Sequence, residues 1–178
     1  GAGLTFIISP LIALMRDQIL HASRLGLSAY TINSTNRDNW DEITEHILSD
    51  RADLVLVSPE RLSNPKFQIE VLLPVSQSTG LLVVDEVHCI SDWGHDFRPD
   101  YRRLKNIVAN IPRTVPILGT TATANDRVIA DVSDQLGSLQ IVRGSLMRDS
   151  IHLQCVEIPQ QSRRLAWLAS TIPALEGS

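Results

Sequence analysis

The sequence predicts an α/β fold with a mostly parallel sheet and helices on both faces. Short apolar runs recur along the 178 residues, and each is apolar over its whole length, as strands covered on both faces are. Segments with helical spacing separate several of these runs, and alternating strands and helices are typical of a parallel sheet. The predicted strands are LTFIIS (4–9), SAYTI (28–32), DLVLVS (53–58), GLLVVD (80–85), VPILGT (115–120) and LQIV (139–142).

The predicted helices lie between these strands and after them. Apolar residues at helical spacing run from Leu11 to Ile19 and from Trp40 to Leu48. Gly26 and Gly137 stand where helix C-caps are expected. From about residue 149 the pattern changes to one extended segment, a proline and one helix over QQSRRLAWLASTI. We therefore predict one domain over residues 1–148 and, over 149–178, a linker with the first helix of an incomplete second domain.

Composition excludes several classes of protein. The hydrophobic fraction of 43% and the charged fraction of 20% are those of a globular protein. No apolar run approaches the roughly 20 residues that cross a bilayer, and no signal peptide is visible, so we expect a cytoplasmic protein without a membrane partner. Cys89 and Cys155 lack the spacing of a zinc site or a disulfide framework. Because the net charge is −4, any contact with nucleic acid must be local rather than spread over a basic surface.

Small polar groups follow five of the predicted strands. Ligands of parallel sheets bind at the carboxyl ends of the strands, so this row indicates a site. Each group taken singly has a simpler interpretation as the cap of the next helix. The five positions are Ser9-Pro10, Asn33-Ser34-Thr35, Ser58-Pro59-Glu60, Asp85-Glu86 and Thr120 to Thr123.

Asp85 and Glu86 form the most chemically suggestive of these strand ends. Mg²⁺ keeps most of its water and takes few protein oxygens, so one carboxylate such as Asp85 suits it. Glu86 could orient and deprotonate a water for attack on a γ-phosphate. The alternative is a strand end with two solvated acids. His88, two residues after Glu86, and the threonines after the next strand favour phosphate chemistry.

An aromatic and basic segment follows the two acids. Aromatic faces stack on unpaired bases without reading sequence, and arginine stacks or binds phosphate. The alternative is that the rings belong to the core and the basic run 98–105 is a solvated helix face. The residues concerned are Trp93, His95, Phe97, Arg98 and Tyr101.

The segment DEVHCISDWGHDFRPDY (85–101) resembles the Walker B box and aromatic-rich loop of the RecQ family of DNA helicases. SPLIALMRDQ (9–18), INST (32–35), VSPERL (57–62) and TTATA (120–124) resemble further motifs of that family in the expected order. The resemblance implies a RecA-like P-loop NTPase fold and an ATP-dependent enzyme that moves 3′ to 5′ on single-stranded DNA. It also implies ATP and Mg²⁺ as cofactors, single-stranded and forked DNA as partners, and a role in DNA repair or recombination, near the nucleoid in a bacterium.

The resemblance also implies roles for individual residues. Asp85 would hold Mg²⁺ through water, Glu86 would be the catalytic base, and His88 would couple the nucleotide to DNA. Thr121 and Thr123 would link the nucleotide site to strand separation. The implied DNA contacts are Ser9, Leu11, Met15, Arg16, Gln18, Ser58, Pro59, Arg61, Trp93, His95, Phe97 and Arg98.

The sequence also departs from the family pattern. Val87 and Asp92 stand where relatives usually have alanine and glutamine, and a proline-asparagine near residue 149 is missing. No GxxxxGK[ST] motif occurs, so the P-loop that holds the β- and γ-phosphates is absent from these residues. We therefore expect the chain by itself to bind ATP weakly and to hydrolyse little. The P-loop strand normally lies inside the sheet, which leaves three outcomes: a closed gap, exchange of elements with another copy, or self-association through an exposed strand.

Two other functions stay open at this stage. One is an RNA-acting motor of the same superfamily, against which the long segment from Ser91 to Tyr101 argues. The other is a non-catalytic module with a degenerate motor fold that binds DNA or a protein.

Overall fold

The structure is a computed structural model, and it describes residues 3–91, 100–101, 104–144 and 154–174. The chain divides into two compact units, residues 1–142 and residues 143–178. The domain boundary predicted at 148/149 lies outside the described residues, so it stays a prediction.

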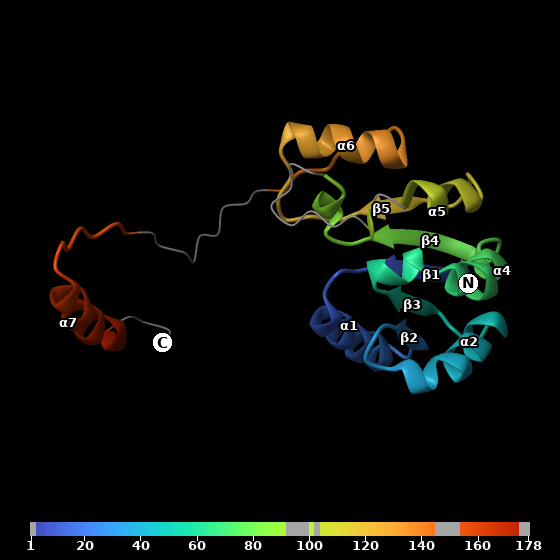
Figure 1. The fold of residues 1–178 in the computed structure, drawn as a ribbon, viewed down its shortest axis with the longest axis horizontal. Coiled ribbons are helices and arrows are strands. Elements are labelled where there is room, and N and C mark those ends of the chain that lie inside the picture. The colour runs from blue at the N-terminus through green and yellow to red at the C-terminus, as the bar shows by residue number, and fades with distance from the viewer. Residues whose placement is uncertain (1–2, 92–99, 102–103, 145–153, 175–178) are drawn as a thin grey trace. The chain divides into compact units, whose positions relative to one another are not determined.

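The first unit is built on a parallel sheet, as predicted. Five strands lie in the order β2-β3-β1-β4-β5, and every neighbouring pair is parallel (Figure 1). Phe6 of β1 lies beside Val55 of β3 and Leu82 of β4, so β1 is at the centre. The strands are β1 Leu4–Ile8, β2 Ala29–Ile32, β3 Leu54–Val57, β4 Thr79–Val84 and β5 Ile117–Gly119.

Five of the six predicted strands are confirmed, and the sixth is wrong. Residues 139–142 form no strand, and Ile141 and Val142 are 53% and 87% exposed. The run is apolar enough for a strand, but it hydrogen-bonds to no neighbouring strand of the described sheet. A strand needs such a partner, which hydrophobicity by itself does not supply.

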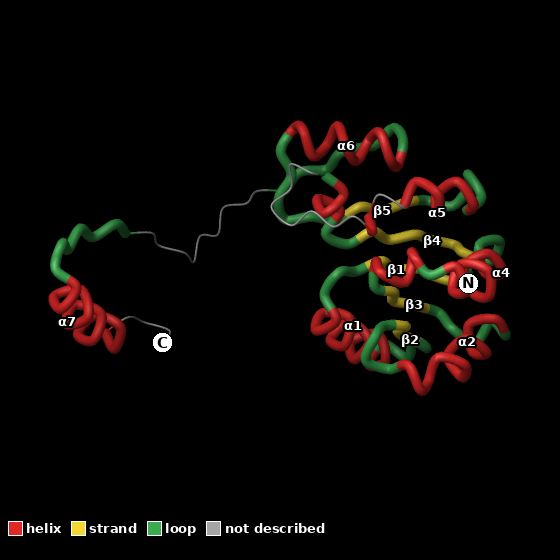
Figure 2. The backbone as a smooth tube through the Cα atoms, in the orientation of Figure 1, coloured by secondary structure: helices red, strands yellow, loops and turns green. Residues whose placement is uncertain are grey.

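Helices connect the strands, and the second unit contributes one more (Figure 2). Both helices predicted before residue 50 are confirmed, as is the helix after Pro159. The α-helices are α1 Ile12–Arg24, α2 Trp40–Leu48, α3 Pro65–Phe67, α4 Leu73–Val75, α5 Leu104–Asn110, α6 Asp126–Leu136 and α7 Gln161–Thr171. The shorter turns are η1 Arg37–Asn39, η2 Pro59–Ser63, the π-helical η3 Gln68–Leu72, η4 Val87–Ile90 and η6 Ile172–Ala174.

Two predicted glycine caps are also confirmed. Gly26 follows the end of α1 with φ +76°, and its N–H donates to the carbonyl of Ser23. Gly137 caps α6 with φ +95°, and its N–H donates to the carbonyl of Ser133. Both lie at positive φ, where glycine has no side chain to clash.

In β1 and β4 the core is packed more completely on one face of the sheet than on the other. In β1, Leu4, Phe6 and Ile8 are buried, whereas the residues between them are only partly buried. Leu82 and Val84 of β4 repeat this alternation. In β3 the consecutive residues Val55, Leu56 and Val57 are all buried, as expected of a strand covered on both faces.

The described sheet is continuous, with β2 and β5 at its two edges. Of the three outcomes expected above, this arrangement agrees with a sheet that has no gap, and self-association stays a prediction. Near the centre, Gly3 has φ +85°, and a Cβ there would clash with the backbone carbonyl of Ser78. No helix in the described ranges is long and apolar enough to span a membrane.

Candidate functional site

The carboxyl ends of the central strands meet at one edge of the sheet, as the sequence predicts. The backbone ladder runs on into the residues that follow the strands. Ser9 N–H donates to the carbonyl of Val57 at 3.1 Å, and Asp85 N–H donates to that of Ile8 at 2.8 Å. Thr120 N–H donates to the carbonyl of Val84 at 3.0 Å. Residues far apart in the sequence are thereby held side by side.

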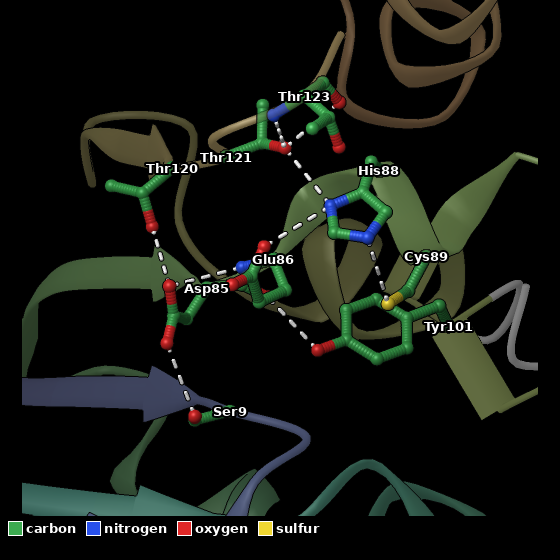
Figure 3. A network of polar contacts seen from close by, with 9 residues as sticks. All are labelled: Ser9, Asp85, Glu86, His88, Cys89, Tyr101, Thr120, Thr121 and Thr123. Atoms are coloured by element: carbon green, nitrogen blue, oxygen red, sulfur yellow. Dashed lines mark hydrogen bonds and ion pairs between the residues drawn. The ribbon is translucent and has the colours of Figure 1, made fainter. Parts of the chain in front are cut away.

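Asp85 is the centre of the resulting polar network (Figure 3). Its Oδ2 accepts a hydrogen bond from Ser9 Oγ at 3.1 Å. Its Oδ1 accepts from Thr120 Oγ1 at 2.8 Å and from the Glu86 N–H at 3.0 Å. Tyr101, which is fully buried, donates its hydroxyl to the Asp85 carbonyl at 2.9 Å. Three donors therefore fix the orientation of one carboxylate, and a hydroxyl from each adjacent strand end takes part.

Glu86 has an unusual backbone conformation. Its φ of 49° and ψ of 46° lie in the left-handed region, where an L-residue is strained. The conformation turns the chain sharply from β4 into η4, and Val87 N–H then donates to the carbonyl of Thr120 at 2.9 Å. The Glu86 side chain is 27% exposed, and its Oε2 lies 3.1 Å from Nδ1 of the buried His88. This oxygen has an ion-pair distance to the imidazole but no aligned hydrogen bond.

His88 joins Glu86 to the threonines after β5. Its Nδ1 is 2.9 Å from Thr121 Oγ1. The Thr121 hydroxyl donates its proton to the carbonyl of Thr123 at 3.0 Å and accepts from the Thr123 N–H at 3.1 Å. Because that proton is already used, Thr121 must accept from His88, and Nδ1 must carry a hydrogen. The negative charge of the Glu86 carboxylate, 3.1 Å from the same nitrogen, favours the same tautomer.

The structure brings the predicted catalytic and coupling residues together. Asp85, Glu86, His88, Thr121 and Thr123 all belong to one network (Figure 3). Sequence reasoning did not predict three further hydrogen bonds of this network. They join the Ser9 and Thr120 hydroxyls to the Asp85 carboxylate and the Tyr101 hydroxyl to the Asp85 carbonyl. Ser9 and Thr120 were visible as polar residues after strands, but the sequence gives no sign of which carboxylate they face.

The aromatic and basic segment is only partly described. Trp93, His95, Phe97 and Arg98 lie outside the described residues. The flanking residues are anchored, since Ser91 donates its hydroxyl to Asp131 of α6 and Ser63 of η2 donates to Asp100.

The residues expected along DNA differ in accessibility. Leu11 and Arg16 are exposed, and Gln18 and Arg61 are half-buried. Ser58 and Pro59 are buried at the end of β3. Ser9 is also fully buried with its hydroxyl on Asp85.

Met15 is fully buried as well, with its sulfur facing the Thr31 hydroxyl at 3.6 Å. The side chains of Ser9 and Met15 are thus used inside the fold, and the place of both residues along the DNA backbone stays a prediction.

A second polar cluster, which the sequence did not reveal, lies after β2 and β3. The Arg61 guanidinium carbon is 3.8 Å from the centre of the Trp40 ring, and that of Arg37 is 6.0 Å away. Burial lowers the pKa of Arg61 from its ordinary value, the positive charge of Arg37 lowers it further, and Glu60 opposes the shift. We call Arg37, Trp40 and Arg61 the Trp40 cluster.

Within the described residues no group of three or more acidic, histidine or cysteine side chains could hold a metal ion. Asp85 fits an ion that is bound mainly through water, because it offers one carboxylate oriented by hydroxyl groups.

Comparison with known proteins identifies the family. The family model described as DEAD/DEAH box helicase matches residues 1–132. The chain belongs to the DEAD/DEAH box helicase family.

Among individual relatives, the chain is 37% identical over 153 residues to the ATP-dependent DNA helicase RecQ of Haemophilus influenzae, covering 84% of the chain and 24% of that protein. It is 40% identical over 137 residues to the ATP-dependent DNA helicase RecQ of Bacillus subtilis, covering 75% of the chain and 22% of that protein. The chain thus spans about a quarter or less of these relatives.

Solved helicase structures share the fold of this family member. The helicase domain of Hef from Pyrococcus furiosus matches with a TM-score of 0.55 and 17% identity, covering 76% of this chain and 27% of that one. The helicase MrfA, in a structure bound to DNA and AMPPNP, matches with a TM-score of 0.56 and 16% identity, covering 75% of this chain and 20% of that one. At these identities the likeness concerns the fold, and it confirms the RecA-like α/β architecture.

Proposed function

We propose that this chain is part of an ATP-dependent DNA helicase of the RecQ type, which couples ATP hydrolysis to 3′ to 5′ movement on single-stranded DNA and to unwinding of forked DNA. The observation that carries the proposal is the network from Asp85 through Glu86 and His88 to Thr121. It joins the strand end after β4 to the strand end after β5. The names of the RecQ relatives support DNA as the substrate. The proposed compartment is the cytoplasm, and the proposed processes are DNA repair and recombination.

The nucleotide side consists of Asp85 and Glu86. Mg²⁺ bound with ATP would supply charge neutralisation for the β- and γ-phosphates. Asp85 would hold the hydrated ion through water, and its three protein donors keep the carboxylate in place before the ion arrives. Glu86 is the proposed base, since its side chain is partly exposed at the strand end while its buried Oε2 lies beside His88. Because the sequence has no P-loop lysine, we propose that these 178 residues turn over little ATP by themselves.

His88 is the proposed coupling residue. Its Nδ1–H lies between the Glu86 carboxylate and the Thr121 hydroxyl, so a change at Glu86 alters the balance of its two contacts. Thr121 and Thr123 precede α6, whose Asp131 accepts from Ser91 at the start of the aromatic segment. A shift of His88 would therefore reach the Ser91 end of that segment.

The DNA side of the proposal rests on the exposed and half-buried residues that the resemblance places along DNA. Leu11, Arg16 and Gln18 lie at the start of α1 and in its first turns, and Arg61 lies in η2 after β3. Their contacts would be with the backbone of DNA, in agreement with the low overall charge of the chain.

The test uses the Glu86→Gln and His88→Ala variants of the full-length protein. We expect Glu86→Gln to lower DNA-stimulated ATP hydrolysis by at least about 100-fold, the lower range of a lost general base. Binding of ATP and of single-stranded DNA should stay close to that of the parent protein. His88→Ala should lower the stimulation by DNA more than the hydrolysis without DNA, because it removes the link rather than the base.

Three outcomes would contradict the proposal. Hydrolysis that persists in Glu86→Gln would exclude Glu86 as the base. DNA binding without any ATP hydrolysis by the parent protein would favour a non-catalytic binding module, and preferential unwinding of RNA duplexes would favour an RNA-acting motor.

A further inference from the structure

The Trp40 cluster combines residues that follow two different strands. Arg37 lies in η1 after β2, Trp40 begins α2, and Arg61 lies in η2 after β3. Since β2 and β3 are parallel neighbours, their carboxyl ends place these segments at the same edge of the sheet. The cluster shares no residue with the network around Asp85.

Trp40 itself is firmly held. Its indole Nε1 donates to the Asn33 carbonyl and to Asn36 Oδ1, both at 3.1 Å. Asn36 Oδ1 also accepts from the Asn33 N–H at 3.0 Å, and its Nδ2 donates to the Thr31 carbonyl at 2.6 Å. These bonds tie the indole to the end of β2, so the ring has one fixed orientation. A guanidinium stacked on a fixed ring also has a defined position.

The two arginines of the cluster carry charges that no ion pair neutralises within the described residues. In the part of the chain that the structure describes, no ion pair joins Arg37 or Arg61 to a carboxylate, and Arg61 Nε is buried without a hydrogen-bond partner. Of the described carboxylates nearby, Glu70 pairs with Lys66 at 3.6 Å, Glu60 acts on Arg61 only through its charge, and Asp41 lines the same pocket without an ion pair to either arginine. Two guanidinium groups around one ring repel each other, and an anion between or beside them would relieve that repulsion.

The chemistry of the missing partner follows from these groups. Guanidinium presents donors in a planar fork that matches two oxygens of a phosphate. Trp40 and Arg61 line an open pocket together with Lys66 and the carboxylates Asp41 and Glu70, so both are reachable from outside.

We propose that Trp40 is the positioning residue for the contact with DNA that the proposed function gives to Arg61, and that the group bound there is a phosphodiester of single-stranded DNA. Trp40 keeps the Arg61 guanidinium oriented by stacking, and Arg37 adds a second positive charge. The proposal rests on the proposed function, because it takes DNA as the ligand. It assigns to Trp40 a part in DNA binding that does not require the indole to touch DNA.

The test measures binding of fluorescein-labelled oligo-dT to the chain by fluorescence anisotropy over a series of salt concentrations. Removing one interaction with a phosphate should lower the slope of log K against log salt by about 0.7 for a single strand. We expect Arg61→Ala and Trp40→Leu each to weaken binding about tenfold, the lower range for removal of a charged hydrogen bond, and to lower this slope. The double variant should bind no more weakly than Arg61→Ala, because Trp40 acts only through Arg61.

Matched variants separate positioning from general loss of structure. Trp40→Phe keeps an aromatic face, so it should retain most of the slope while losing the indole N–H bonds. Arg24→Ala removes an exposed arginine in the last turn of α1 and should change neither the slope nor the affinity by more than about twofold. Circular dichroism checks that each variant is folded, and Trp40→Phe replaces Trp40→Leu as the decisive comparison if the latter is unfolded. In that case Trp40→Phe must keep the slope of the parent, whereas Arg61→Ala must lose it.

Several results would overturn the inference. Additive effects of Trp40→Leu and Arg61→Ala would show that Trp40 acts independently, and an unchanged slope in Arg61→Ala would exclude the interaction with phosphate. Both results leave the proposed helicase function standing, provided that Glu86→Gln abolishes ATP hydrolysis in the full-length protein. No binding of oligo-dT by either the chain or the full-length protein would overturn the inference and the DNA part of the proposed function together.

Discussion

The left-handed backbone of Glu86 predicts that a substitution to glycine stabilises the fold, whereas most substitutions destabilise a protein. Replacing Glu86 with glycine should stabilise the fold relative to Glu86→Gln, which keeps the size of the side chain and the strained backbone. The left-handed region costs an L-residue about 1–2 kcal/mol. Glycine has no such cost, but it loses about 0.5–1 kcal/mol through its greater freedom in the unfolded chain.

The net gain should therefore be about 0.5–1 kcal/mol in the free energy of unfolding. The contact with His88 takes little from this gain, because Glu86 Oε2 has no aligned hydrogen bond. For a domain of this size the gain corresponds to a rise in Tm of about 1–4 °C over Glu86→Gln. Urea denaturation followed by circular dichroism measures the free energy, and a thermal scan measures the Tm.

Asp50 provides the matched control, because it is the other described non-glycine residue at positive φ, with φ 56°, and lies after α2, outside the polar network of Asp85. Asp50→Gly should give a gain of the same sign and smaller size, since aspartate tolerates this region better than glutamate. Suppose that Glu86→Gly is less stable than Glu86→Gln while Asp50→Gly is more stable than the parent. The relief of backbone strain at Glu86 is then smaller than the interactions that its side chain makes, which refutes the prediction.

Three further variants test packing, the network and a helix cap. Gly3→Ala should destabilise by more than about 2 kcal/mol in urea denaturation, because its Cβ would clash with a backbone carbonyl, whereas Gly26→Ala, with open space around it and a similar φ, should cost only about 1 kcal/mol; equal costs would contradict the clash. Ser9→Ala should cost about 1–3 kcal/mol, because it removes a buried donor from the Asp85 carboxylate, and an unchanged midpoint of unfolding would argue against that bond. Asn125→Ala should lower the free energy of unfolding by about 1 kcal/mol, because the side chain caps α6 through two backbone N–H groups; Asn125→Asp keeps an acceptor and should lose much less.

Much of the fold could be predicted from the residues because local signals agreed with the tertiary arrangement. Five apolar runs became neighbouring strands, and Gly26 and Gly137 became helix caps at positive φ. The run 139–142 failed because strand formation depends on a partner that the run itself cannot indicate. The burial of Met15 could not be predicted for a related reason, since its helical position showed neither which face of α1 is buried nor that Thr31 lies opposite.

The sequence by itself determined the family, the order of the strand-end motifs and the acidic pair at Asp85 and Glu86, because these depend on residues that are close together in the chain. Only the tertiary structure decided which groups from separate strands meet. It placed the Ser9 and Thr120 hydroxyls on Asp85, the imidazole of His88 between Glu86 and Thr121, and the guanidinium of Arg61 on Trp40. The physical reason is that strand order and register set distances across the sheet, and neither can be derived from the residues of one strand.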